Sequence, residues 1–355
     1  MEEHVPLKPN RRAIQDPITG FDIGVDHARY GVDGWYFDNA DGQFQCVKDG
    51  YNHGKKQFPK PTVKYSDADI RFVRKWLHLR LNAFRRGRMF SPELTWESFK
   101  SIDTPVCPIL REPFTYGQRL GTDWTIDRIN NDAAYAPGNI VCMSARANEA
   151  KNRRGTRGCL MASVAAKESS DGIYFELNES QWMRLAYLTA LNSTKRGADY
   201  GMLPMAIYPP PGVSLVNSYH ILQHACIALF FPIRKENYRS TALLKAFKTL
   251  GDHNLQKRIL KFSTMAVTTN QCCRKRQPNA QFALGDAWAT PLITSQWMDL
   301  VERITPTQVL EVITTYSRIL NHDSTIEFDY ADEDKSWSLD TRGFVTKGDL
   351  CASFG

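Results

Sequence analysis

The chain has 355 residues, of which 42% are hydrophobic and 11% aromatic, and its formal net charge is +7. This length allows two or three domains with their own cores, and the apolar share excludes a disordered chain. No apolar run approaches the roughly 20 residues that span a bilayer, and the opening segment lacks the apolar stretch of a secretory signal. We therefore expect a soluble, cytoplasmic protein that does not contact membranes.

The eight cysteines include no CxxC pair. This spacing favours reduced thiols over a disulfide framework or a structural zinc site.

Residues 1–65 are rich in Gly, Asp, Asn and Pro. Such a composition predicts an N-terminal arm of loops and short strands rather than long helices.

A long amphipathic helix is predicted from residue 66, with Ser66 as its cap and Gly87 as its stop. Apolar residues recur at helical spacing at Ile70, Val73, Leu77, Leu81 and Phe84. Its outer face is basic, since residues 71–88 contain no acid. Charge runs usually form solvated surface, but a run without acids favours contact with phosphates. With a second basic cluster after residue 150, the predicted DNA contacts are Arg74, Lys75, Arg85, Arg86, Arg88, Lys151, Arg153 and Arg154.

A strand–loop–strand–helix unit is predicted for residues 124–154. Alternating residues indicate a strand in "WTIDRI", a turn-rich loop surrounds the Pro-Gly pair, and "IVCM" forms a second strand before Ser144 caps a helix. Such a unit can bring an Asp at the end of its first strand and an Asn on its helix to one metal ion.

The residues of this unit resemble the HNH nucleases, or ββα-metal superfamily, in the variant of phages and mobile elements. The matching elements are Cys107-Pro108, Asp127-Arg128-Ile129, Tyr135, Pro137-Gly138-Asn139, Ala147-Asn148 and Lys151. The resemblance covers roughly residues 105–155, under a sixth of the chain.

The resemblance implies a catalytic site formed by Asp127, Arg128, Asn139 and Asn148. Asp127 and Asn148 would bind Mg²⁺ or Mn²⁺, which would stabilise charge on the leaving oxygen of a scissile phosphate. Asn139 would hold the loop or the general base in place. The expected fold is α+β, with a basic helix before the nuclease module and a mostly α-helical C-terminal domain after it.

Arg128 stands where the best-studied members of the family have a histidine that activates water. Arginine remains protonated, so it cannot be the base, although it could bind a phosphate oxygen or stabilise the transition state. The base would then be a hydroxide on the metal or a histidine from elsewhere, with His27, His53 and His78 as candidates. His27 is the loop histidine of most interest, with a plain hydrogen-bonding role as its default interpretation. A further alternative is a module that binds DNA without cutting it.

The second half, residues 165–355, carries helical periodicity and becomes acidic near its C-terminus, over residues 323–340. His220 and His224 have the spacing of a zinc pair, but their apolar flank favours buried structural histidines. Trp182, Trp288 and Trp297 are predicted core anchors.

These patterns predict an N-terminal arm (1–65), a basic helix with the HNH-like module (66–158, core 105–155) and a helical domain (165–355). The predicted function is a metal-dependent DNA endonuclease, which would nick one strand because one HNH module cuts one strand. The alternative is a catalytically attenuated HNH-fold protein that binds DNA or regulates. The helical domain would supply target recognition, a homodimer contact or a surface for a phage or host protein.

Overall fold

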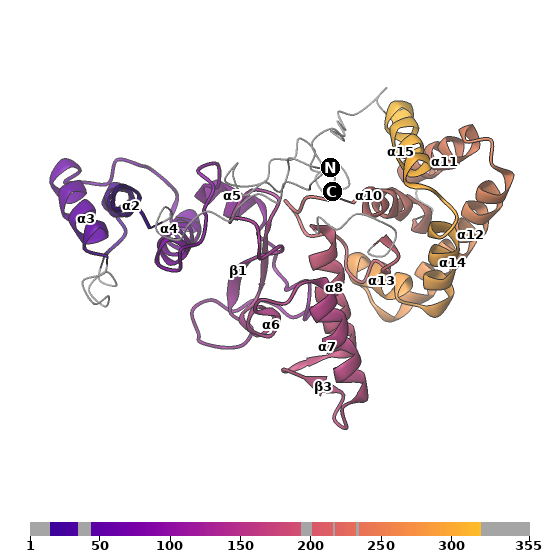
Figure 1. Ribbon diagram of the computed structural model, residues 1–355, viewed down its shortest axis with the longest axis horizontal. Coiled ribbons are helices and arrows are strands. Elements are labelled where there is room, and N and C mark those ends of the chain that lie inside the picture. Colours follow the sequence, from indigo (N-terminus) through magenta and orange to yellow (C-terminus); the bar gives the residue numbers. More distant parts are fainter. Residues whose placement is uncertain (1–14, 35–43, 193–200, 216, 232–233, 321–355) are drawn as a thin grey trace, which may run out of the picture. The chain divides into compact units, whose positions relative to one another are not determined.

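The computed structural model describes residues 15–34, 44–192, 201–215, 217–231 and 234–320 (Figure 1). The fold is mixed, mostly helical with two small antiparallel sheets, as the α+β prediction requires at that level. None of the helices in these ranges is long and apolar enough to cross a bilayer. The predicted acidic segment, residues 323–340, lies outside the described residues.

Contacts divide the described chain into two compact units. Unit 1 comprises residues 15–103 and 132–139, and unit 2 comprises residues 104–131 and 140–320. The domain boundaries predicted at residues 65, 158 and 165 stay a prediction.

Unit 1 contains α2 (Pro17–Arg29), α3 (Gln45–Gln57), the 3-10 turn η2 (Asp67–Asp69), α4 (Ile70–Arg85) and α5 (Trp96–Ser101). The strands of unit 2 are β1 (Trp124–Arg128), β2 (Ile140–Ser144), β3 (Ile173–Tyr174) and β4 (Leu177–Asn178). Its helices are α6 (Ala145–Lys151), α7 (Thr156–Glu168), α8 (Glu179–Leu191), α10 (Ser218–Ala225), η3 (Cys226–Phe230), α11 (Arg234–Thr249), α12 (His253–Arg276), α13 (Ala280–Trp288), α14 (Pro291–Val301) and α15 (Pro306–Leu320).

The prediction of loops and strands before residue 65 is wrong for α2 and α3, which lie side by side (Figure 1). Their glycines are contact points rather than turn residues. A Cβ added at Gly24 would overlap the carbonyl oxygen of Val47, and one added at Gly50 would overlap that of Phe21. The two backbones approach so closely because glycine has no Cβ.

Helix α4 has the predicted apolar face. Val73, Leu77 and Leu81 are fully buried, and Gly87, with φ of 60°, ends the helix. The start differs from the prediction, because Ser66 Oγ donates to Asp69 Oδ2 (2.6 Å) and opens η2 before the α-helix begins at Ile70.

The core of unit 2 contains the three predicted tryptophan anchors, Trp182, Trp288 and Trp297, all fully buried. His220 and His224 are also buried, as predicted. Burial lowers the pKa of His224 to about 3, so its ring is neutral in the folded protein at neutral pH.

Candidate functional site

The predicted strand–loop–strand–helix unit is present. β1 pairs antiparallel with β2, with Trp124 opposite Ser144 and Arg128 opposite Ile140. Ser144 Oγ accepts a hydrogen bond from the Ala147 amide (3.3 Å), so the predicted serine caps α6.

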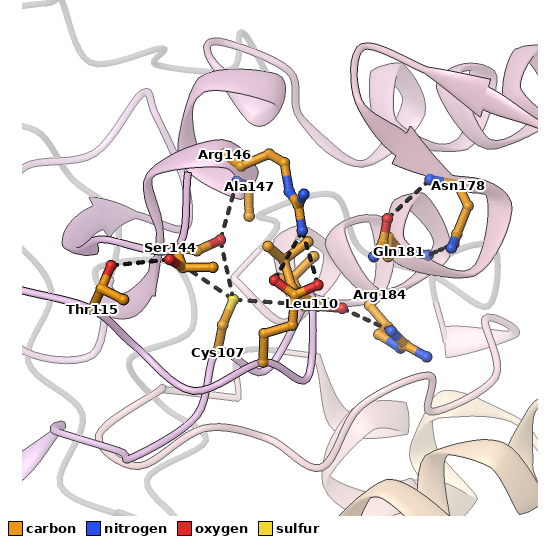
Figure 2. Close-up of polar contacts among 12 residues, drawn as sticks. Cys107, Leu110, Thr115, Ser144, Arg146, Ala147, Asn178, Gln181 and Arg184 are labelled. Carbon is orange, nitrogen blue, oxygen red and sulfur yellow. Dashed lines mark hydrogen bonds and ion pairs between the residues drawn. The ribbon is translucent and has the colours of Figure 1, made fainter. Parts of the chain in front are cut away.

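The Cys107 loop fixes the junction between β2 and α6 (Figure 2). Cys107 Sγ accepts hydrogen bonds from the amides of Ser144 (3.3 Å) and Leu110 (3.5 Å), and the thiol lies 3.5 Å from Ser144 Oγ. Within the described ranges, no three His, Cys, Asp or Glu side chains group to hold a metal ion. Through its contacts with Ser144, Cys107 positions the start of α6.

Helix α6 contacts β1 through two parallel hydrogen bonds. Asn148 Nδ2 donates to Thr125 Oγ1 (3.2 Å), and Lys151 Nζ donates to Asp127 Oδ2 (2.8 Å). Residues two apart on a strand share a face, as do residues three apart on a helix. The contacts therefore bring Asp127 and Asn148, the two predicted metal ligands, to adjacent positions.

Lys151 is a fully buried lysine that holds the Asp127 carboxylate. Its ammonium also donates to the carbonyl oxygen of Arg128 (2.8 Å). Lys151 was predicted to contact DNA, but in this conformation its ammonium is fully buried, so it contacts Asp127 and not solvent. A buried charge needs a partner, and Asp127 supplies it.

Two side-chain oxygens remain available at this position. Oδ1 of Asp127 and Oδ1 of Asn148 accept no hydrogen bond from the described residues, and both side chains keep some exposure to solvent. A carboxylate and an amide oxygen are hard donors that suit Mg²⁺ or Mn²⁺, with water and phosphate completing the coordination. The donor set fits such an ion.

Arg128 has a structural contact. Only 6% of the residue is exposed, and its Nη1 donates to the carbonyl oxygen of Asn131 (2.8 Å), at the turn that follows β1. As the neighbour of Asp127 on a strand, it points to the opposite face. In this conformation Arg128 holds the turn after β1, and its role at a phosphate or in the transition state stays a prediction.

Asn139 is fully buried in unit 1, where its Nδ2 donates to the carbonyl oxygen of Ala134 (2.8 Å). The same loop is held to the segment after α4, since the amide of Tyr135 donates to Met89 O and the amide of Ser91 donates to Tyr135 O. Asn139 therefore closes the loop on itself, in keeping with a loop-holding role.

The basic helix α4 is less basic in the fold than in the sequence. Asp103 pairs with Arg71 and Asp26 pairs with Arg80, so acids from other segments neutralise part of its face. Of the predicted DNA contacts in unit 1, Arg74 and Arg86 are exposed, while Lys75, Arg85 and Arg88 are half-buried. In unit 2, Arg153 is exposed and Arg154 lies over the Phe175 ring at 4.6 Å.

His27 is not the loop histidine that was expected. It lies in α2, fully buried, with Nδ1 2.7 Å from the carbonyl oxygen of Ile23. Burial lowers the pKa of His27 to about 3. His53 and His78, the other candidates for the base, lie in α3 and α4 of unit 1.

Comparisons with protein-family models, curated proteins and solved structures find no significant match to this chain. The function is therefore inferred from its own residues and their geometry.

Proposed function

We propose that this protein is a metal-dependent DNA endonuclease of the HNH type, which nicks DNA by hydrolysing a phosphodiester. The observation that supports this proposal best is the pair of contacts between β1 and α6, Thr125 to Asn148 and Asp127 to Lys151. These contacts hold the helix that carries the Asn148 amide against the strand that carries the Asp127 carboxylate, and the resemblance implies that these two residues bind the metal ion.

Asp127 and Asn148 would hold Mg²⁺ or Mn²⁺ through their Oδ1 atoms. The ion, when bound, supplies charge stabilisation for the phosphate and its leaving oxygen. Lys151 fixes the orientation of the Asp127 carboxylate from behind, and Cys107 fixes the start of the helix that carries Asn148. Both contacts pre-organise the site before DNA binds.

Exposed cations would bind the DNA backbone. Arg74 and Arg86 on or after α4 and Arg153 after α6 can reach phosphates without leaving an ion pair that the structure describes. Arg71 and Arg80 are engaged with carboxylates and contribute less.

The second candidate function is DNA binding without cleavage. One observation favours it, because the Lys151 ammonium already neutralises the Asp127 carboxylate and weakens its attraction for a divalent ion. Activity and binding must therefore be measured on the same samples.

The deciding experiment uses Asn148→Ala, with Thr125→Val as its matched control. Both variants remove the same 3.2 Å hydrogen bond, but only Asn148→Ala removes the amide oxygen. Supercoiled plasmid is incubated with each protein and Mg²⁺ or Mn²⁺. We expect nicking by the wild type and by Thr125→Val, and a loss of about 100-fold or more in Asn148→Ala, the size of effect seen when a stabilising group is removed from a transition state.

Equal nicking by Asn148→Ala and the wild type would contradict the proposal. No nicking by the wild type, together with salt-dependent binding to a DNA duplex, would establish the second function instead.

A further inference from the structure

Helix α7 exposes an apolar stripe between two opposite charges. Arg157, Met161, Val164 and Glu168 follow one another at intervals of four, three and four residues, so they share one face. Met161 is 65% exposed and Val164 52% exposed. The opposite face, with Cys159, Ala162 and Ala166, is buried. A single exposed apolar residue is ordinary, but an aligned pair on a helix beside further exposed apolar residues marks an interaction surface.

The hairpin that packs against α7 exposes further apolar residues. β3 packs against α7 (Figure 1), and Ile173 and Phe175 are 39% and 57% exposed. Phe175 and Glu176 form the turn with φ of 45° and 62°. Positive φ at both central residues is the usual geometry of a two-residue hairpin turn, and here it leaves the Phe175 ring exposed beside Arg154.

The stripe is complementary to itself. The point between Ala162 and Ser163 is equally distant in sequence from Arg157 and Glu168, and also from Met161 and Val164. If two copies of α7 pair antiparallel about a two-fold axis, Arg157 faces Glu168 of the second copy and Met161 faces Val164. Within the described chain, neither Arg157 nor Glu168 has an ion-pair partner. Their charges are available for such a contact.

We propose that α7 and the β3–β4 hairpin form a homodimer interface, with the two α7 helices antiparallel across a two-fold axis. This is the geometry that an isologous contact requires, because the same patch must fit its own copy. A nucleic acid fits the surface less well, since Glu168 and Glu176 would repel phosphates.

The dimer would change the cleavage product, a consequence that rests on the proposed function. Only residues 152–155 separate α6, which carries Asn148, from α7. Each copy in the dimer would therefore bring its own nuclease module to the α7 interface. Two modules held by one axis could cut both strands, whereas a monomer would nick one.

The test is sedimentation equilibrium of the full chain without DNA or metal, so that it is independent of nuclease activity. We expect a concentration-dependent dimer for the wild type. Arg157→Glu or Glu168→Arg should each weaken it about tenfold, because two ion pairs become two repulsions. Mixing these two single variants, or combining both changes in one chain, should restore dimerisation. Arg153→Glu, with the same charge change on an exposed residue outside the stripe, should leave it unchanged.

Three results would overturn the interface. They are a wild type that stays monomeric at all concentrations, a dimer that is indifferent to both single variants, and a weakened dimer that neither mixing nor the double exchange restores. A fourth contrary result would be unchanged sedimentation with tighter binding of a DNA duplex by Glu168→Arg, which would assign the surface to nucleic acid.

Discussion

The α2–α3 pair of unit 1 and the β1–β2–α6 segment of unit 2 are both polar, glycine-containing stretches of the sequence. For the second, sequence patterns predicted each strand, the cap at Ser144 and the helix. For the α2–α3 pair, sequence patterns predicted loops where the structure has two helices. The two regions differ in what their glycines and polar residues contact.

The secondary structure of β1–β2–α6 follows from patterns within a few residues, although the contacts between β1 and α6 join residues 23 and 24 apart. Ser144 caps the helix through Ala147, three residues away, so a local reading is sufficient. In α2–α3 the decisive contact joins Gly24 to Val47, which lie 23 residues apart in the chain. A glycine whose role is set by a distant backbone has the same local signature as a glycine in a turn.

The largest expected effect tests whether the ion pair between Asp127 and Lys151 holds α6 to β1. Asp127→Ala should lower the free energy of unfolding by about 3–5 kcal/mol, because it leaves the buried Lys151 ammonium without its carboxylate. Adding Lys151→Met should recover most of this loss. Chemical denaturation measures both variants, and equal losses in the single and double variants would show that the ion pair is not what holds α6 to β1.

The next effect tests the close packing of α2 on α3. Gly24→Ala should destabilise the protein by about 1–3 kcal/mol or more, because the added methyl overlaps the carbonyl oxygen of Val47. In a helix that packs on nothing, the same change would stabilise by about 1 kcal/mol. The sign of the shift in thermal midpoint therefore shows whether α2 packs closely on α3. The control, Asp22→Ala on the exposed side of α2, should stay within about 0.5 kcal/mol of the wild type.

Acid sensitivity should appear in both units. Burial lowers the pKa of His27 in α2 and of His224 in α10 to about 3. Both rings are neutral when folded, whereas the unfolded chain takes up protons below about pH 6.5. Their contribution to stability is therefore complete above that pH and is lost as the pH falls from about 6.5 towards 3.

Between pH 6.5 and 5.5 each histidine should cost up to about 1.4 kcal/mol of unfolding free energy. Denaturation of His27→Leu and His224→Phe at pH 7.5 and 5.5 measures this dependence. Each substitution should reduce the pH dependence by about one proton, and an unchanged dependence in a folded variant would show that the ring is not buried as described.

The smallest expected effect is at the local cap. Ser144→Ala should cost about 1 kcal/mol, because the Ala147 amide loses its acceptor, while Ser144→Asp should retain most of the stability. A scan of thermal unfolding compares the two. A much larger loss in both variants would show that the contact with Cys107 matters more than the cap.

The sequence alone determined the secondary structure of the β1–β2–α6 unit and the amphipathic face of α4. Each depends on periodicity or on a cap that acts within one or two turns of the chain. The tryptophan anchors of unit 2 were predictable for a related reason, since large apolar side chains have few alternatives to burial.

Only the tertiary structure decided the roles of the charged residues and the glycines. Lys151 was predicted to contact DNA and is buried against Asp127, and the fold gives Arg128 a contact with the Asn131 turn that the sequence does not indicate. Asp103 and Asp26 neutralise Arg71 and Arg80, although the acids are distant from these arginines in the sequence. The sequence gives the charge and size of each side chain. The partner that a side chain contacts lies on another segment, so only the folded structure shows how its charge is neutralised or its surface packed.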